Sequence, residues 1–129
     1  MKTDFDLLGD ALPMAQKNDR PEAGALREVL QALSAHSAVA WCERMNSGAV
    51  QIGKRFVRFG WKGCPDVLGQ LKDGRLLGVE VKGPKGKLRP EQIIFMERIN
   101  SAGGVAFMAR DCRDVIRELD ITGRKQNDD

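Results

Sequence analysis

The segment from Asp66 to Lys82 limits the possible folds of this chain more than any other part of it. Residues 67–79 contain two mostly apolar runs on either side of Lys72-Asp73-Gly74, a combination typical of two strands joined by a tight turn. A hairpin of this kind folds back on itself. We therefore expect Asp66, just before the first strand, to lie close to Glu80, at the end of the second strand.

Alternation of side chains along the second strand divides its last residues between two faces. Val79 and Val81 are predicted to face a core, whereas Glu80 and Lys82 share the opposite face. Together with Asp66, they would place three charged groups where one divalent cation and one water molecule could meet a phosphate. The same residues are also compatible with a chance spacing and an exposed Glu80–Lys82 salt bridge worth about 0.2–1 kcal/mol.

Length and composition indicate one ordinary globular domain. With 129 residues, of which 42% are hydrophobic and 30% charged, the chain can build a single core but not two. No run approaches the roughly 20 apolar residues that cross a bilayer, and the N-terminus lacks the basic and apolar regions of a secretory signal. We therefore expect a cytoplasmic protein without a membrane partner.

The cysteines and the histidine argue against several kinds of site. Cys42, Cys64 and Cys112 are odd in number and lack the paired spacing of a zinc site or a disulfide framework. His36 lies far along the chain from the charged motif, which argues against a His-based triad or a typical zinc site. Any metal bound by the motif must be held by oxygen atoms, which favours Mg²⁺ or Mn²⁺.

The distribution of basic residues says more about partners than the net charge of +3 does. Basic side chains precede Asp66 and follow Lys82, as expected for a groove that follows a phosphate backbone around a metal site. The alternative is two solvated loops. The candidate DNA-binding residues are Lys54, Arg55, Arg58, Lys62, Lys85, Lys87 and Arg89.

Along the chain, the pattern predicts a helix, three or four strands, a helix, a strand and a helix. Residues 1–19 are expected to form a variable arm, residues 20–121 the domain, and residues 122–129 a polar, disordered tail. This order fits an α/β fold with a mixed β-sheet flanked by helices, although other small α/β folds share it. The expected elements are a helix from Pro21, a strand at 38–42, a turn at 45–49, a strand at 56–59, the hairpin, a helix at 90–100, a strand at 105–109 and a helix at 112–119.

Several short segments between about Pro21 and Leu119 carry a resemblance to a known family. They are Asn46-Ser47-Gly48, Arg58-Phe59-Gly60, Lys62-Gly63-Cys64-Pro65-Asp66, Gly78-Val79-Glu80-Val81-Lys82-Gly83-Pro84, Gly86-Lys87-Leu88-Arg89-Pro90-Glu91-Gln92 and Gly103-Gly104-Val105. On these segments, the chain resembles the VRR-NUC family, the virus-type replication-repair nucleases of the PD-(D/E)xK superfamily. The most specific part of the match is Glu80-Val81-Lys82 followed, ten residues after Lys82, by Gln92.

The resemblance implies a restriction-endonuclease-like PD-(D/E)xK core and a role for each residue of the motif. Asp66 and Glu80 would ligate Mg²⁺ or Mn²⁺, helped by the backbone carbonyl of Val81. Lys82 would orient the attacking water or stabilise its hydroxide form. Gln92 would belong to the active site and hold Lys82 or a water; its alternative is an ordinary glutamine on a helix surface.

The motif gives less information about the roles of two further positions. The superfamily often supplies one more acid from the first helix, and Glu22 matches that position better than its competitor Glu28 does. A glutamate in a first helical turn also complements the helix dipole. Asn46 lies in a glycine-containing turn that the family shares, so it is a candidate for DNA contact or a plain turn residue.

The expected function is metal-dependent, structure-specific cleavage of branched DNA, similar to that of a Holliday junction resolvase. Two active sites in a homodimer would cut both strands of a symmetric junction. A small domain has little surface for reading bases, which favours recognition of DNA shape and backbone. The alternatives are a catalytically weak DNA-binding or recruitment module on the same fold and a sequence-specific restriction-type nuclease. The resemblance alone suggests a phage or prophage origin.

Overall fold

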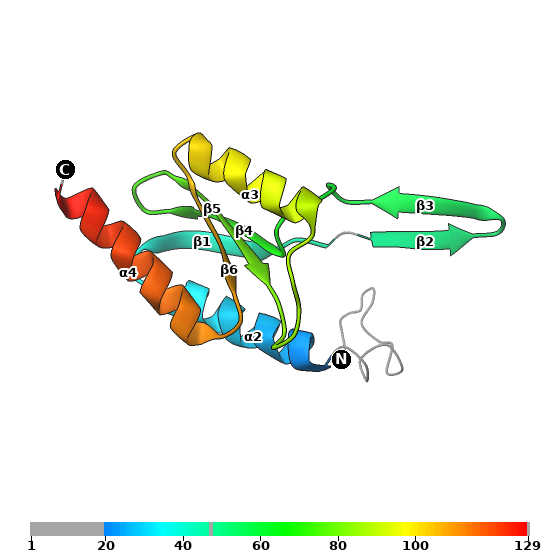
Figure 1. The fold of residues 1–129 in the computed structure, drawn as a ribbon, viewed down its shortest axis with the longest axis horizontal. Helices are drawn as coiled ribbons and strands as arrows, with labels where there is room; N and C mark the ends of the chain where they lie inside the picture. Colours follow the sequence, from blue (N-terminus) through cyan, green and yellow to red (C-terminus); the bar gives the residue numbers. More distant parts are fainter. Residues whose placement is uncertain (1–19, 47, 129) are drawn as a thin grey trace.

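The structure, a computed structural model, describes residues 20–46 and 48–128; the expected arm at residues 1–19 lies outside this part. It consists of a mixed sheet with helices on both faces and a separate hairpin that projects from this body (Figure 1). In chain order the elements are α2 (Arg20–Ala35), β1 (Val39–Arg44), β2 (Gly48–Ile52), β3 (Arg55–Phe59), β4 (Val67–Leu71), β5 (Leu76–Val81), α3 (Pro90–Ser101), β6 (Val105–Ala109) and α4 (Cys112–Asp128).

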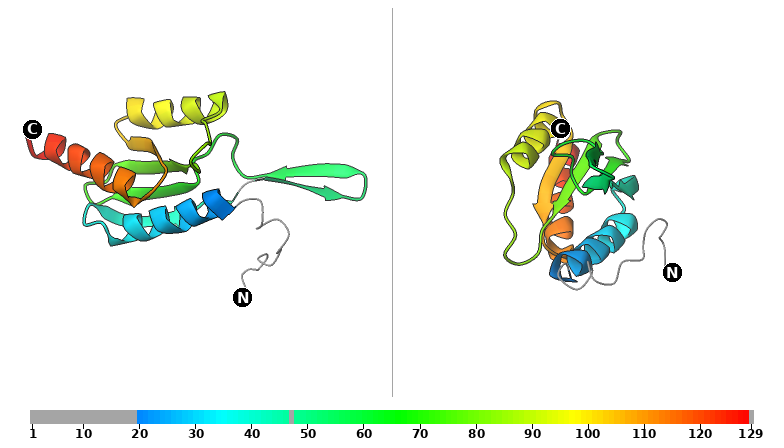
Figure 2. Two further views of the ribbon diagram at one scale, coloured as in Figure 1. Left: turned by 60° about the horizontal axis from the view of Figure 1, so that its bottom comes forward. Right: turned by 90° about the vertical axis from the view of Figure 1, so that its right-hand side faces the viewer.

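The main sheet has four strands in the order β1-β4-β5-β6. β1 and β4, and β4 and β5, are antiparallel, whereas β5 and β6 are parallel. A parallel pair needs a crossover connection, and α3 provides it. α3 covers one face of the sheet, while α2 and α4 lie together on the other (Figure 2). This architecture confirms the expected α/β class with a mixed, helix-flanked sheet and is consistent with a restriction-endonuclease-like fold.

β4 and β5 form the hairpin that the sequence predicts. Val67 pairs with Val79, and Gln70 pairs with Leu76, in antiparallel register. In the connecting turn Gly74 has a φ of +98°, a left-handed conformation that favours glycine. The turn lies at one end of the hairpin, so the residues next to Val67 and Val79 meet at the other end.

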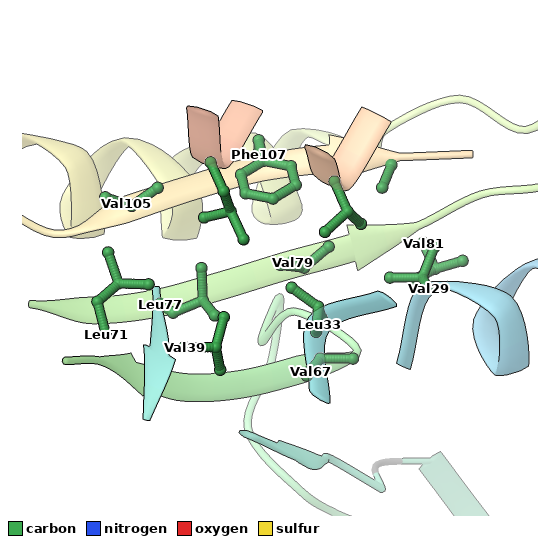
Figure 3. Close-up of a cluster of buried hydrophobic side chains, with 13 residues drawn as sticks. Val29, Leu33, Val39, Val67, Leu71, Leu77, Val79, Val81, Val105 and Phe107 are labelled. Carbon is green, nitrogen blue, oxygen red and sulfur yellow. The ribbon is translucent and has the colours of Figure 1, made fainter. Parts of the chain in front are cut away.

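The hydrophobic core lies between the sheet and the layer formed by α2 and α4 (Figure 3). Val29 and Leu33 of α2, and Val115 and Leu119 of α4, are buried in this core. Their spacing of four residues places each pair on one side of its helix, which explains how two largely polar helices each present an apolar stripe. The sheet contributes Val39, Val67, Leu71, Leu77, Val79, Val81, Val105, Phe107 and Ala109.

The structure contains a strand where the sequence predicts a turn at residues 45–49. β2 begins at Gly48 and pairs with β3 in a two-stranded antiparallel sheet of its own. The sequence signal for β2 is weak because only Val50 and Ile52 alternate with other residues over a short length. Pairing with β3 supplies the strand, as expected when strand formation depends on context more than on intrinsic preference.

The last helix is longer than the sequence predicts. We expect a helix at residues 112–119 and a disordered tail from residue 122, but the backbone of α4 stays helical through Asp128. The expected helix end at residue 119 was too early, because polarity was given more weight than helix propensity. Arg, Lys and Gln, which fill residues 124–126, are all good helix formers. No helix among the described residues is long and apolar enough to span a membrane.

Gly63 should be the glycine whose replacement most disturbs the loop between β3 and β4. Its φ is +77°, and an added Cβ would collide with the backbone carbonyl of Glu91 in α3; Gly74, at +98°, has open space around it. We expect Gly74→Ala to lower the free energy of unfolding by about 1–2 kcal/mol through backbone strain alone. Gly63→Ala should cost about 1–3 kcal/mol more through the added collision. Urea unfolding followed by circular dichroism measures both, and equal losses would contradict the prediction.

Candidate active site

The open end of the β4–β5 hairpin brings two carboxylates together. Asp66 directly precedes β4, and Glu80 lies near the end of β5. The backbone N–H of Val81 donates a 2.8 Å hydrogen bond to Oδ2 of Asp66. This bond fixes the Asp66 side chain against the strand that carries Glu80, so the spatial proximity expected from a hairpin is present.

Glu80 and Lys82 lie on the α3 side of the sheet and are both buried, with 2% and 9% of their surfaces exposed. Lys82 Nζ is 3.5 Å from Oε2 of Glu80. The pair is therefore a buried ion pair and not the exposed salt bridge considered as the alternative. Burying two charges is expensive, and such a pair adds little to stability compared with an apolar one. The presence of this buried pair is therefore explained more simply by a function than by a gain in stability.

Gln92 links α3 to this pair. Its side-chain Nε2 donates a 2.8 Å hydrogen bond to Oε2 of Glu80, while its Oε1 accepts a 2.9 Å bond from the backbone N–H of Arg89. Pro90 begins the helix, which places Gln92 in its first turn. The glutamine is thus buried and held at both ends of its amide group. Its partner is Glu80, whereas the family resemblance implies Lys82 or a water.

The surroundings of Glu80 disfavour the charged form of its carboxyl group. Burial, and then the nearby charge of Asp66, raise its pKa to about 7, although Lys82 acts in the opposite direction. Its Oε1 is buried and has no hydrogen-bond partner among the described residues. A buried carboxylate oxygen without a donor is costly. A hard divalent cation would satisfy it, so the side chains present fit the oxygen-ligated metal that the family implies.

Two residues that were not expected at the site from the sequence also contact or border it. Cys64 is half-buried, and the pKa of its thiol is raised by burial and then by the charges of Glu80 and Asp66. This keeps the thiol neutral beside the carboxylates; its position two residues before Asp66 is the one signal in the sequence. Arg110 donates from Nη1 to the carbonyl of Gly83 and so braces the chain after Lys82. No sequence pattern indicates that contact.

The two candidate helix acids have different surroundings. Glu28 accepts a 2.8 Å hydrogen bond from the backbone N–H of Cys112 at the start of α4, which gives it a structural role. Glu22 is exposed in the first turn of α2. It lies two helical turns before Val29, which belongs to the same buried core as Val81 (Figure 3). Among the described residues no three His, Cys, Asp or Glu side chains form a metal-holding group, so Glu22 is not brought to the carboxylates and stays a prediction.

The candidate DNA-binding residues divide into two groups. Lys62 lies in the loop before Asp66, and Lys85, Lys87 and Arg89 lie in the loop after Lys82; all four are exposed. They flank the site, as the sequence suggests.

The remaining candidates belong to the projecting hairpin. Lys54 and Arg55 lie at its far end, away from Asp66 (Figure 1). They do not lie beside the carboxylates, because β2 and β3 pair with each other and not with the main sheet, and their contact with DNA stays a prediction. Asn46 is exposed at the base of the hairpin. The side chain of Arg58 is outside the described part of the structure.

The raised pKa of Glu80 predicts a pH-dependent stability. Between about pH 4.5, the ordinary pKa of a glutamate, and about pH 7, the native state keeps a proton that the unfolded state has lost. The contribution of Glu80 to the free energy of unfolding therefore falls as the pH rises through this window. In EDTA, Glu80→Gln should stabilise the protein at pH 8, on the order of 2 kcal/mol once solvent screening is allowed for. At pH 4.5 it should have little effect. Urea unfolding at both pH values measures this, and equal effects at the two would contradict it.

Comparison with known proteins agrees with the geometry of the site. The sequence model of the VRR-NUC domain matches residues 12–111, a range that contains Asp66, Glu80, Lys82 and Gln92. No curated protein and no solved structure matches the chain. A match over most of the chain that includes all four of these residues shows that the protein belongs to the VRR-NUC domain family of DNA-binding nucleases.

Proposed function

We propose that this nuclease hydrolyses phosphodiester bonds of branched DNA with Mg²⁺ or Mn²⁺ held by Asp66 and Glu80. The observation that carries the proposal is Oε1 of Glu80, a buried carboxylate oxygen without a hydrogen-bond donor. In each carboxylate one other oxygen is already bonded, to the Val81 N–H in Asp66 and to Gln92 in Glu80. Two fixed carboxylates with an unsatisfied oxygen suit a hard cation, and the carbonyl of Val81 is a further candidate ligand.

Each side chain of the site would have a distinct task. When bound, the metal ion would act as a Lewis acid toward the phosphate and lower the pKa of water. Lys82 supplies a positive charge within 3.5 Å of Glu80, where it can orient the attacking water and stabilise negative charge that develops on the phosphate. Gln92 fixes the orientation of the Glu80 carboxylate through its 2.8 Å hydrogen bond.

The surroundings of the site favour recognition of the DNA backbone. Exposed basic side chains lie in both loops that flank the carboxylates, Lys62 on one side and Lys85, Lys87 and Arg89 on the other. Such residues contact phosphates without reading sequence. One chain has one such site, so cutting both strands of a symmetric junction requires a second copy, and a two-fold homodimer supplies it.

Replacing the charged motif should abolish cleavage. We expect Asp66→Asn and Lys82→Ala each to lower the rate of DNA cleavage by at least about 100-fold, because they remove a ligand and a charge from the transition state. Lys72→Ala, an exposed lysine at the opposite end of the hairpin, is the matched control and should retain activity. The measurement uses purified protein with Mg²⁺ or Mn²⁺ and four substrates: a four-way junction, a flap, single strands and a linear duplex.

The pattern of products separates the alternatives. Paired, symmetric cuts in the junction support a dimeric structure-specific enzyme. Cutting of linear duplex at one sequence would instead support a restriction-type nuclease. No cutting of any substrate with either metal would support a binding module that lacks useful turnover.

Gln92 should act through Glu80 and not through the DNA. We expect Gln92→Ala to raise the Mg²⁺ concentration needed for half-maximal cleavage by about 10–100-fold, the usual effect of removing a residue that orients a metal ligand. Affinity for DNA in EDTA should stay within about twofold. Glu97→Ala, on the exposed side of the same helix, is the control. A loss of DNA affinity without a shift in the Mg²⁺ requirement would contradict this role.

A further inference from the structure

The β2–β3 hairpin is an element that the main fold does not explain. It forms a two-stranded sheet separate from the main sheet, and it extends away from the body of the protein (Figures 1 and 2). Val50, Ile52 and Phe56 are 43%, 61% and 76% exposed. Isolated two-stranded hairpins are only marginally stable in water, and apolar side chains exposed together mark a contact surface. The hairpin therefore presents apolar side chains that have no partner among the residues that the structure describes.

Apolar side chains occur on both faces of the hairpin near its tip. Ile52 lies opposite Arg55, and Phe56 lies opposite Gln51. Because side chains alternate along each strand, Ile52 and Phe56 point to opposite faces. A flat partner surface would cover one face and leave the other exposed. Insertion of the tip into a groove or a gap covers both.

The charge of the hairpin favours nucleic acid as the partner. Residues 48–59 contain Lys54, Arg55 and Arg58 and no acidic residue. Two such hairpins would repel each other, whereas the phosphates of DNA attract them. A basic β-ribbon whose tip also exposes apolar side chains suits DNA, in which apolar groups can insert between bases that are partly unstacked.

The base of the hairpin is attached to the catalytic residues. The backbone N–H of Met45, just before β2, donates a 2.7 Å hydrogen bond to the carbonyl of Asp66. Arg44 at the end of β1 pairs with Val67, the residue after Asp66. DNA whose phosphate lies at Asp66 therefore lies at the base of the hairpin. A five-residue strand extends about 16 Å, or roughly five base pairs of DNA.

We propose that the β2–β3 hairpin is a DNA-binding arm that recognises the branch point of the substrate. Lys54 and Arg55 contact phosphates on either side of the branch. Ile52 and Phe56 contact bases that are unstacked there, a contact that fully paired duplex does not offer. The arm selects branched DNA, and its fixed attachment at Asp66 sets the distance between the branch and the cut. This inference rests on the proposed function for the position of the cleaved phosphate.

The test measures base unstacking in the absence of metal. A four-way junction carries 2-aminopurine beside the branch point and is titrated with the full-length protein in EDTA; the fluorescence of this base increases when it unstacks. We expect wild type to increase the fluorescence and Phe56→Ser to abolish the increase while weakening junction binding about tenfold. Binding to linear duplex should change less than about twofold. Ile116→Ser, which removes an exposed side chain of α4 (48% exposed), is the matched control and should behave as wild type.

A second pair of variants tests the phosphate contacts. Lys54→Ala should reduce the slope of log affinity against log salt concentration by about one, as expected for one lost phosphate contact. Lys72→Ala should leave that slope unchanged. Phe56 is outside the core, so both hairpin variants should retain the circular dichroism spectrum and the unfolding midpoint of wild type.

Two outcomes would overturn the inference. One is an unchanged fluorescence response in Phe56→Ser. The other is that light scattering shows Phe56→Ser to be a monomer and wild type a dimer, while junction binding and fluorescence are unchanged. That result would mean that the hairpin contacts a second copy of the chain. A different result would contradict the proposed function alone. If wild type cuts no DNA with either metal but the fluorescence differences are present, the hairpin is still a DNA-binding arm and the catalytic assignment is wrong.

Discussion

The carboxyl group of Glu80 is the point at which the separate parts of this molecule meet. It lies on β5, it is buried beneath α3, and it contacts Lys82 just after that strand and Gln92 from the helix. Asp66, held by the neighbouring backbone of β5, raises its pKa together with burial. None of these contacts satisfies Oε1. The fold thus keeps an acidic group in a place where its charge is unfavourable, which is typical of a site that binds something.

The position of α3 decides whether this site exists. Gln92 reaches Glu80 because Pro90 and Arg89 begin the helix directly above the end of β5. Gly63 in the loop before Asp66 lies against the backbone of Glu91 in the same helical turn. The loop that leads to Asp66 and the helix that carries Gln92 are therefore packed against each other. Any movement of α3 would change the surroundings of Glu80 in two ways, through Gln92 and through the loop that leads to Asp66.

The β2–β3 hairpin is joined to the candidate active site at the start of β4. The Met45 N–H bonds to the carbonyl of Asp66, and the side chain of Asp66 bonds to the Val81 N–H. Only a few residues separate Asp66 from a hairpin with exposed apolar and basic side chains. In the proposed function, this arrangement combines cleavage at the end of the sheet with recognition of DNA at a distance.

The sequence by itself determined the elements and contacts that depend on residues close along the chain. The Lys72-Asp73-Gly74 turn, the alternation around Val79 and Val81, and the helix that begins at Pro90 all follow from local rules. The expected hairpin also predicts that Asp66 lies next to Glu80, and the motif spacing indicates the family. These features could be predicted because turn chemistry and side-chain periodicity act over a few residues.

Tertiary structure alone decided the burial of the Glu80–Lys82 pair, the choice of Glu80 as the partner of Gln92, and the bond between Glu28 and Cys112. It also decided that β2 pairs with β3, which carries Lys54 away from the site. Periodicity cannot predict these contacts, because each depends on which elements pack together and how closely. Whether a charge is exposed or buried is a property of its neighbours in space, and those neighbours come from distant parts of the chain.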